Sequence, residues 1–90
     1  MNQTNAVEAG IKDFIARNLL FDQEGFPYTD DASFLQEGII DSLGVMELLA
    51  YVQSAFGVTV DQHEVTPANF DSVNKLAAFV RRKQQEKTAA

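Results

Sequence analysis

A chain of 90 residues that is 46% hydrophobic and carries a net charge of −6 has the length and composition of one small folded domain, expected over residues 1–90. The absence of cysteine excludes a disulfide framework, a thiolate metal site and a cysteine nucleophile. No apolar run approaches the ~20 residues that span a bilayer, and no early segment has the pattern of a signal peptide. These features agree with a cytoplasmic location.

The negative charge is concentrated in the middle of the chain. No lysine or arginine occurs between Arg17 and Lys75, whereas ten acidic residues lie in that interval. An acidic surface repels nucleic acid and anionic membranes, so we predict neither as a partner. It would attract basic protein surfaces. For any one of these acids, a solvated surface charge is the simpler interpretation.

The first predicted helix spans about residues 5–20, with Thr4 or Asn5 as its cap and residues 1–4 as a disordered tail. Its apolar residues recur at helical spacings and form one face, which we expect to lie in the core. They are Val7, Ile11, Phe14, Ile15 and Leu19.

Residues 21–40 are predicted to form a long first loop, because Gly25 and Pro27 are turn and breaker residues. A loop of this length in a compact domain needs an anchor. We expect Phe34 and Leu35 to provide it by packing into the core, and a short helical turn around 32–36 is an option.

The second predicted helix spans about residues 42–56. Asp41 and Ser42 are both preferred cap residues, and Gly57 suits the left-handed position that ends a helix. Leu48, Val52 and Phe56 repeat every four residues and should be buried. A second apolar stripe should then be exposed beside Ser42, unless the helix is buried all round; it consists of Leu43, Met46 and Ala50.

The rest of the chain reads as an extended link over 57–60, a turn over 61–64 and two helices. Thr66 followed by Pro67 predicts a short helix over 67–70. Asp71 or Ser72 should cap a last helix that frays near residue 84, with 85–90 as a disordered tail. The sequence therefore predicts an all-α four-helix bundle with three longer helices and one short helix.

Ser42 is the strongest candidate for a functional residue. A helix N-terminus presents unpaired N–H groups and partial positive charge, so it suits a phosphate. By position alone, a role as a simple cap would be the more economical interpretation of this serine.

The triplet Asp41-Ser42-Leu43, followed by Met46-Glu47-Leu48, strongly resembles the modification site of acyl carrier proteins. The resemblance covers about residues 4–84. It implies a carrier rather than an enzyme, in which Ser42 bears 4′-phosphopantetheine and holds an acyl or aminoacyl group as a thioester. Asp41 would help a phosphopantetheinyl transferase, which uses coenzyme A, to position its magnesium and donor.

The resemblance also implies partners and a binding face. The implied partners, besides the transferase, are an acyl- or aminoacyl-loading ligase and downstream acyl-transferring enzymes. They would bind a monomeric carrier. The residues expected to contact these partners are Leu43, Met46, Glu47 and Ala50.

Two departures from the resemblance favour a specialised pathway over bulk fatty-acid synthesis. Ile39 and Ile40 separate Gly38 from Asp41, where many members have a glycine nearer the modified serine. Gln53 and Ser54 stand where carriers of the fatty-acid type tend to be acidic. The cargo would belong to secondary metabolism, lipid modification or amino-acid loading.

Two alternatives come from other functional classes. The chain could be an unmodified helical interaction module that binds a protein through its acidic patch. It could also be a small hydrolase with Ser42 as nucleophile, but a triad is poorly supported because His63 is the only histidine. With one histidine and no cysteine, we predict no metal site.

Overall fold

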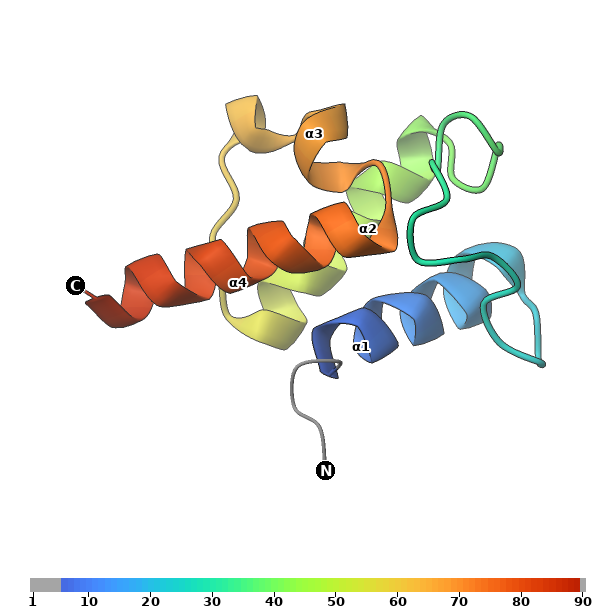
Figure 1. Ribbon diagram of the computed structural model, residues 1–90, viewed down its shortest axis with the longest axis horizontal. Helices are drawn as coiled ribbons and strands as arrows, with labels where there is room; N and C mark the ends of the chain where they lie inside the picture. Colours follow the sequence, from blue (N-terminus) through green and yellow to red (C-terminus); the bar gives the residue numbers. More distant parts are fainter. Residues whose placement is uncertain (1–5, 90) are drawn as a thin grey trace.

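The computed structural model describes residues 6–89, and in this range it contains helices and no strands. The helices are α1 (Ala6–Ile15), α2 (Ser42–Phe56), α3 (Pro67–Phe70) and α4 (Val73–Ala89). In Figure 1, α4 crosses the middle of the molecule with α1 below it and α3 above it, and α2 passes behind. The predicted all-helical fold, with three longer helices and one short helix, is confirmed. Within residues 6–89, no helix has both the length and the apolar character needed to cross a bilayer.

The first predicted helix ends differently from the expected regular helix over residues 5–20. Regular α-helical structure stops at Ile15, and residues Ala16–Leu20 form a π-helical turn, η2. Phe21 follows in the left-handed conformation, with φ of 55°. A π-helical turn is wider than an α-helical one; such turns are rare and are frequent at functional sites. The predicted cap at Thr4 or Asn5 and the predicted tail over 1–4 lie outside the described residues.

The core lies where α1 packs against both α2 and α4. The predicted face of α1 supplies Val7, Ile11 and Ile15, which are buried, while its Phe14 stacks on Tyr51 of α2 at 4.5 Å between ring centroids. Five buried side chains of α4 complete the core: Val73, Leu76, Ala77, Phe79 and Val80.

The segment between η2 and α2 contains no helix or strand in the described structure, and it is tied to the start of α4. Phe34 is 1% exposed, as predicted, and its N–H donates to the Asp71 carbonyl at 2.8 Å. The same prediction for Leu35 is wrong, because this side chain is 60% exposed. The Leu35 N–H donates to the Asp71 carboxylate, and this hydrogen bond fixes the backbone with Phe34 turned inward and Leu35 outward.

The last helix begins as predicted, because the Ser72 hydroxyl accepts from the Lys75 N–H and caps α4. It then runs to Ala89 and so includes residues 85–89, for which the sequence analysis predicted a disordered tail. Arginine, lysine, glutamine and glutamate dominate residues 81–86, and all four are strong helix formers. No glycine or proline follows Pro67 to stop the helix.

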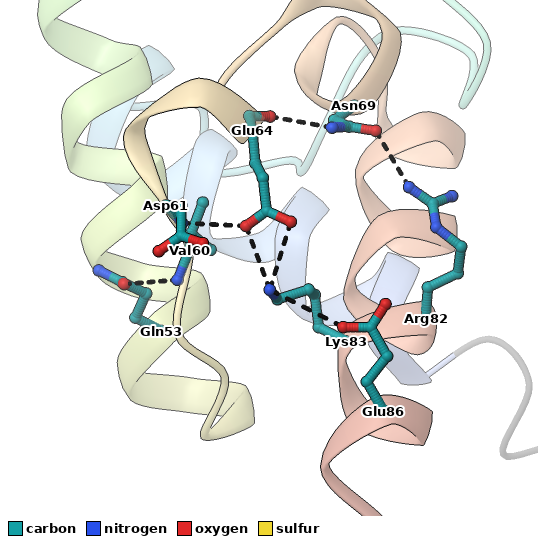
Figure 2. A network of polar contacts seen from close by, with 8 residues as sticks. All are labelled: Gln53, Val60, Asp61, Glu64, Asn69, Arg82, Lys83 and Glu86. Atoms are coloured by element: carbon teal, nitrogen blue, oxygen red, sulfur yellow. Dashed lines mark hydrogen bonds and ion pairs between the residues drawn. The ribbon is translucent and has the colours of Figure 1, made fainter. Parts of the chain in front are cut away.

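A polar network joins the turn after α2 to α4 (Figure 2). The turn is the 3-10 helix η3 (Gln62–Glu64). The Glu64 carboxylate accepts from the Asp61 N–H at 2.9 Å and from Lys83 Nζ at 3.1 and 3.3 Å. Arg81 makes a second link, to Glu8 of α1, at 2.6 Å. These contacts hold α1, η3 and the second half of α4 together.

The Glu64 contacts predict an acid-dependent stability. Hydrogen bonding from the Asp61 N–H, and then from Lys83, lowers the pKa of Glu64 below its ordinary value of 4.5. The ionised carboxylate therefore stabilises the folded state above pH 4.5, and this contribution is lost as the pH falls through the lowered pKa. We expect Glu64→Gln to be less stable than the natural protein at neutral pH, with the gap closing in acid.

Urea midpoints measured between neutral and acidic pH would test this prediction. Glu86→Gln is the matched control, because the Glu86 side chain is 71% exposed and lies 4.0 Å from the same lysine. A gap between Glu64→Gln and the natural protein that does not depend on pH would contradict the assignment.

Candidate functional site

The start of α2 shows which of two neighbouring residues, Asp41 or Ser42, caps the helix, a choice that the sequence left open. Asp41 is the cap, with an extended backbone, and its Oδ1 accepts from the Gly44 N–H at 2.8 Å. Ser42 is the first residue of the helix and is exposed. Its hydroxyl makes no hydrogen bond to any of residues 6–89. The interpretation of Ser42 as a simple cap is therefore wrong, and its hydroxyl is available for chemistry.

The helix end beside this hydroxyl suits an anion. The N–H groups of Ser42 and Leu43 have no hydrogen-bond partner within the described residues, because the helix begins at Ser42. Free N–H groups at the start of a helix attract a phosphate, an effect that the partial charge of the 15-residue α2 reinforces. A phosphate ester on Ser42 Oγ would lie beside these groups, so the site fits a covalently attached phosphopantetheine.

The first turn of α2 rests on buried residues that the sequence analysis did not place in the core. Ile39 and Ile40 are each 5% exposed. Gly44 packs so tightly that a Cβ atom there would lie 2.5 Å from Ile40 Cγ2 and 3.6 Å from Leu19 Cδ1. An apolar residue just before a helix cap is a recognised packing signal, and it could have identified Ile40. The first turn of α2 is thus packed closely against Ile40 and against Leu19 of η2.

The face of α2 next to Ser42 is exposed, as predicted, so the alternative of a helix buried all round is wrong. Leu43 and Met46 are 69% and 60% exposed, whereas Leu48 and Val52 are fully buried. Glu47 and Ala50 are also exposed. Met46, Glu47 and Ala50 follow Leu43 by three, four and seven residues, so all of them lie on the same side of α2 as Leu43. We call these four residues the α2 stripe.

Exposed acidic side chains without basic partners occur on the α2 stripe and in the residues just before it. Glu37, Asp41 and Glu47 are exposed, and none of them forms an ion pair within residues 6–89. The basic residues of the described chain that are ion-paired lie on α1, η2 and α4. The exposed start of α2 thus combines apolar side chains with unpaired acidic ones.

Two grooves flank the start of α2. The Phe21 groove has a volume of about 330 Å³ and lies between η2 and α2. The Leu35 groove has a volume of about 160 Å³ and lies between α2 and α3. The first is lined by residues that include Asn18, Leu19, Phe21, Asp41, Leu43 and Glu47; the second is lined by residues that include Leu35, Val45, Val65, Pro67, Phe70 and Asp71.

Other chemistry at Ser42 finds no support in the described residues. No histidine lines either groove beside it, so nothing there resembles the base of a hydrolase triad. Elsewhere, Asp61, His63 and Glu64 bring potential metal ligands within 4.8 Å of one another. The Glu64 carboxylate is already held by Lys83 and the Asp61 N–H, and these contacts account for its position.

The capping role of Asp41 can be measured apart from its charge. Asparagine also caps helices well, so Asp41→Asn should leave the free energy of unfolding close to that of the natural protein. Asp41→Ala removes the acceptor of the Gly44 N–H and should cost about 0.5–2 kcal/mol. Urea unfolding followed by circular dichroism would measure both. Equal destabilisation by asparagine and alanine would show that the charge, and not the hydrogen bond, is what stabilises α2.

Comparison with known proteins gives matches over most of the chain. Residues 9–80 match the family described as phosphopantetheine attachment site. The chain is 30% identical over 79 residues to the D-alanyl carrier protein of Lacticaseibacillus casei, covering 88% of this chain and 95% of the relative. The D-alanyl carrier protein of Lacticaseibacillus rhamnosus matches with the same identity and coverage. Aminoacyl carrier protein 1 of Bradyrhizobium diazoefficiens is 36% identical over 62 residues, covering 69% of this chain and 68% of the relative.

Proposed function

The chain belongs to the family of phosphopantetheine-dependent carrier proteins, and from this we propose that Ser42 is its attachment site and that an aminoacyl group is its cargo. Members of this family carry 4′-phosphopantetheine covalently and hold an acyl or aminoacyl group on it. When bound, this group supplies the thiol that forms the thioester. The observation that carries the proposal is the exposed Ser42 hydroxyl, free of hydrogen bonds at the start of α2, inside the matched region.

The chain's own residues would present the attached group rather than perform catalysis. The Asp41 side chain accepts from the Gly44 N–H and leaves the N–H groups of Ser42 and Leu43 free. These free N–H groups would stabilise the phosphate. The carboxylate of Asp41 is also exposed, and we assign it the further role of helping a transferase position its magnesium. Asp41→Asn keeps the cap, so slower attachment in that variant would be due to the charge. An unchanged rate would remove this role.

An aminoacyl cargo is supported by the relatives and by the charge around the site. The relatives named above are D-alanyl and aminoacyl carriers. An aminoacyl thioester carries a free ammonium group, and the exposed acids next to Ser42, Asp41 and Glu47, have no basic partner within the described chain. We therefore place the protein in a specialised pathway that loads amino acids, and D-alanine is the first cargo to test.

Three classes of partner follow from this function. A phosphopantetheinyl transferase attaches the arm from coenzyme A, a ligase loads the amino acid, and an acyl-transferring enzyme removes it. We propose that they dock on the α2 stripe, which combines exposed apolar residues with the unpaired Glu47, and that the carrier acts as a monomer. Coenzyme A and the energy source of a ligase are cytoplasmic, and we place the protein there.

Loading by a ligase tests both the cargo and the docking surface. The modified protein, incubated with ATP, D-alanine and a ligase specific for D-alanine and its carrier, should gain the mass of one alanyl group. Met46→Ala should slow loading about tenfold, because a truncated contact residue at an interface often costs more than 1 kcal/mol. Thr59→Ala is the control, since Thr59 is exposed in the link after α2.

Two results would contradict these assignments. Equal loading rates for Met46→Ala and Thr59→Ala would exclude the α2 stripe as the docking surface. Loading by a neutral acyl group, with no loading by any amino acid, would exclude the aminoacyl cargo. The alternative function, an unmodified interaction module, predicts that incubation with coenzyme A and a transferase adds no mass at all.

A further inference from the structure

We propose that the Phe21 groove receives an arginine side chain of the ligase that loads the carrier, so that the docking surface extends from the α2 stripe to η2. This inference rests on the proposed function and adds a second contact to it. Two members of the α2 stripe, Leu43 and Glu47, line the Phe21 groove. The groove therefore continues the surface on which the enzymes are proposed to dock.

The charge of the groove favours a basic occupant. The carboxylates of Asp41 and Glu47 line the groove, and none of the residues that line it is basic. Neither carboxylate forms an ion pair within residues 6–89. A positive side chain that enters the groove thus meets two acids that the described chain leaves unpaired, and it complements their charge.

Exposed apolar side chains line the same groove as these acids. Phe21 and Leu43 are 78% and 69% exposed. Arginine suits both features at once, because its planar guanidinium group stacks on an aromatic ring and also pairs with a carboxylate. An apolar occupant would leave the acids without a partner, and the compact ammonium group of lysine has no flat surface to place on the ring. The mixed lining therefore favours arginine.

The backbone at Phe21 holds the ring in this position although the conformation is unfavourable. Among residues 6–89, Phe21 is the one residue other than glycine with a positive φ. The N–H groups of Phe21 and Asp22 both donate to the Ala16 carbonyl, and these hydrogen bonds close η2. Glycine is the residue that this left-handed position suits best. Outliers of this kind recur at binding sites, and a contact made by the exposed ring accounts for a phenylalanine here.

The groove lies on a different side of α2 from the proposed attachment site. Ser42 does not line the groove. Leu43 and Glu47 follow Ser42 by one and five residues, and these spacings do not place side chains on one face of a helix. An arginine in the groove therefore leaves Ser42 uncovered, so the arm is free to enter the active site of the docked ligase.

Steady-state loading of the modified protein tests the inference, with the same ligase as in the loading experiment above and the carrier as the varied substrate. Phe21→Ala should raise the KM for the carrier about tenfold with kcat nearly unchanged, because the lost contact is made equally in the ground state and the transition state. Leu35→Ala is the matched control, since Leu35 is an apolar residue of the other groove and is 60% exposed. Its KM should equal that of the natural protein.

A double-mutant cycle tests whether one arginine contacts both Phe21 and Glu47. Glu47→Gln alone should also raise the KM about tenfold. If one arginine binds both residues, the double variant should show much less than the roughly hundredfold rise expected from two independent contacts. The control cycle combines Phe21→Ala with Met46→Ala, at a residue of the α2 stripe that does not line the groove, and should give the full product.

Phe21→Gly separates the contact from the fold. Glycine relieves the left-handed strain, and this gain offsets its greater freedom in the unfolded chain. We therefore expect this variant to unfold at nearly the same urea concentration as the natural protein, and yet to show the same rise in KM as Phe21→Ala.

The outcomes separate this inference from the proposed function. An unchanged KM for Phe21→Ala, or an equal rise for Phe21→Ala and Leu35→Ala, would overturn the inference. Independent, multiplicative effects of Phe21→Ala and Glu47→Gln would do the same. Neither result bears on the α2 stripe, which Met46→Ala tests by itself. Absence of loading of the natural protein by any amino acid would instead overturn the proposed function.

Discussion

Ser42→Ala is expected to abolish attachment of phosphopantetheine completely while leaving the fold intact. The serine hydroxyl is the proposed acceptor, and no other group in the first turn of α2 can replace it. The fold should tolerate the change because the Ser42 side chain is exposed and Asp41 caps the helix. We expect the free energy of unfolding to change by no more than about 0.5 kcal/mol, as for other surface substitutions. Intact mass after co-expression with a broad-specificity phosphopantetheinyl transferase measures the first effect, and urea unfolding measures the second.

Ser54→Ala is the matched control, because Ser54 is also an exposed serine of α2. This variant should gain one phosphopantetheine, like the natural protein. A mass gain in Ser42→Ala would mean that another residue is the attachment site. No gain in the natural protein, under conditions in which a known carrier is fully modified, would instead support the unmodified interaction module.

The largest effect on stability is expected for Phe34→Ala, at about 3–5 kcal/mol. Phe34 is 1% exposed and belongs to the core although it lies outside every helix. Its N–H donates to the Asp71 carbonyl, and its own carbonyl accepts from the Ile39 N–H at 2.9 Å. Loss of the ring would leave a cavity under the segment that leads into the first turn of α2. Urea unfolding should show the loss, and a small domain of this kind has little stability to spare.

Phe21→Ala provides the comparison, since the same residue type in the same segment is 78% exposed there. We expect that variant to unfold at nearly the same urea concentration as the natural protein. Equal destabilisation by the two substitutions would mean that Phe34 does not anchor the segment as the structure shows.

The helix ends that could be predicted from the sequence are those with local chemical signals. Gly57 adopts the left-handed conformation, with φ of 67°, and ends α2 at Phe56 as expected. Pro67 begins α3, and Ser72 caps α4. Each of these positions is determined by one residue and its immediate neighbours, so no tertiary contact is needed to identify it.

What the sequence could not give depends on contacts between distant residues. In a segment without helical or strand periodicity, nothing local distinguishes Leu35 from Ile39, yet the first is exposed and the second buried. Asp71, far along the chain, decides this by binding the backbone of residues 34 and 35. The end of α1 was missed for a related reason, because apolar spacing does not tell a π-helical turn from an α-helical one.

The candidate site shows the same division. The motif around Ser42 could be recognised from adjacent residues, and so could the exposed α2 stripe. The choice of Asp41 over Ser42 as the cap could not be predicted, because aspartate and serine are both preferred at that position. The groove beside Phe21 was also out of reach, since it depends on how η2 packs against α2.

The unpaired acids at the start of α2 also affect how two copies of the carrier meet. Glu37, Asp41 and Glu47 are exposed on every copy, so a loaded carrier that approaches the free thiol of an unloaded carrier brings like charges together. This repulsion opposes direct thioester exchange between them, and it weakens as salt screens the charges. We expect the aminoacyl group to leave instead through an enzyme whose docking surface supplies basic residues. The docking surface that we propose would thus also oppose exchange of aminoacyl groups between loaded and unloaded carriers.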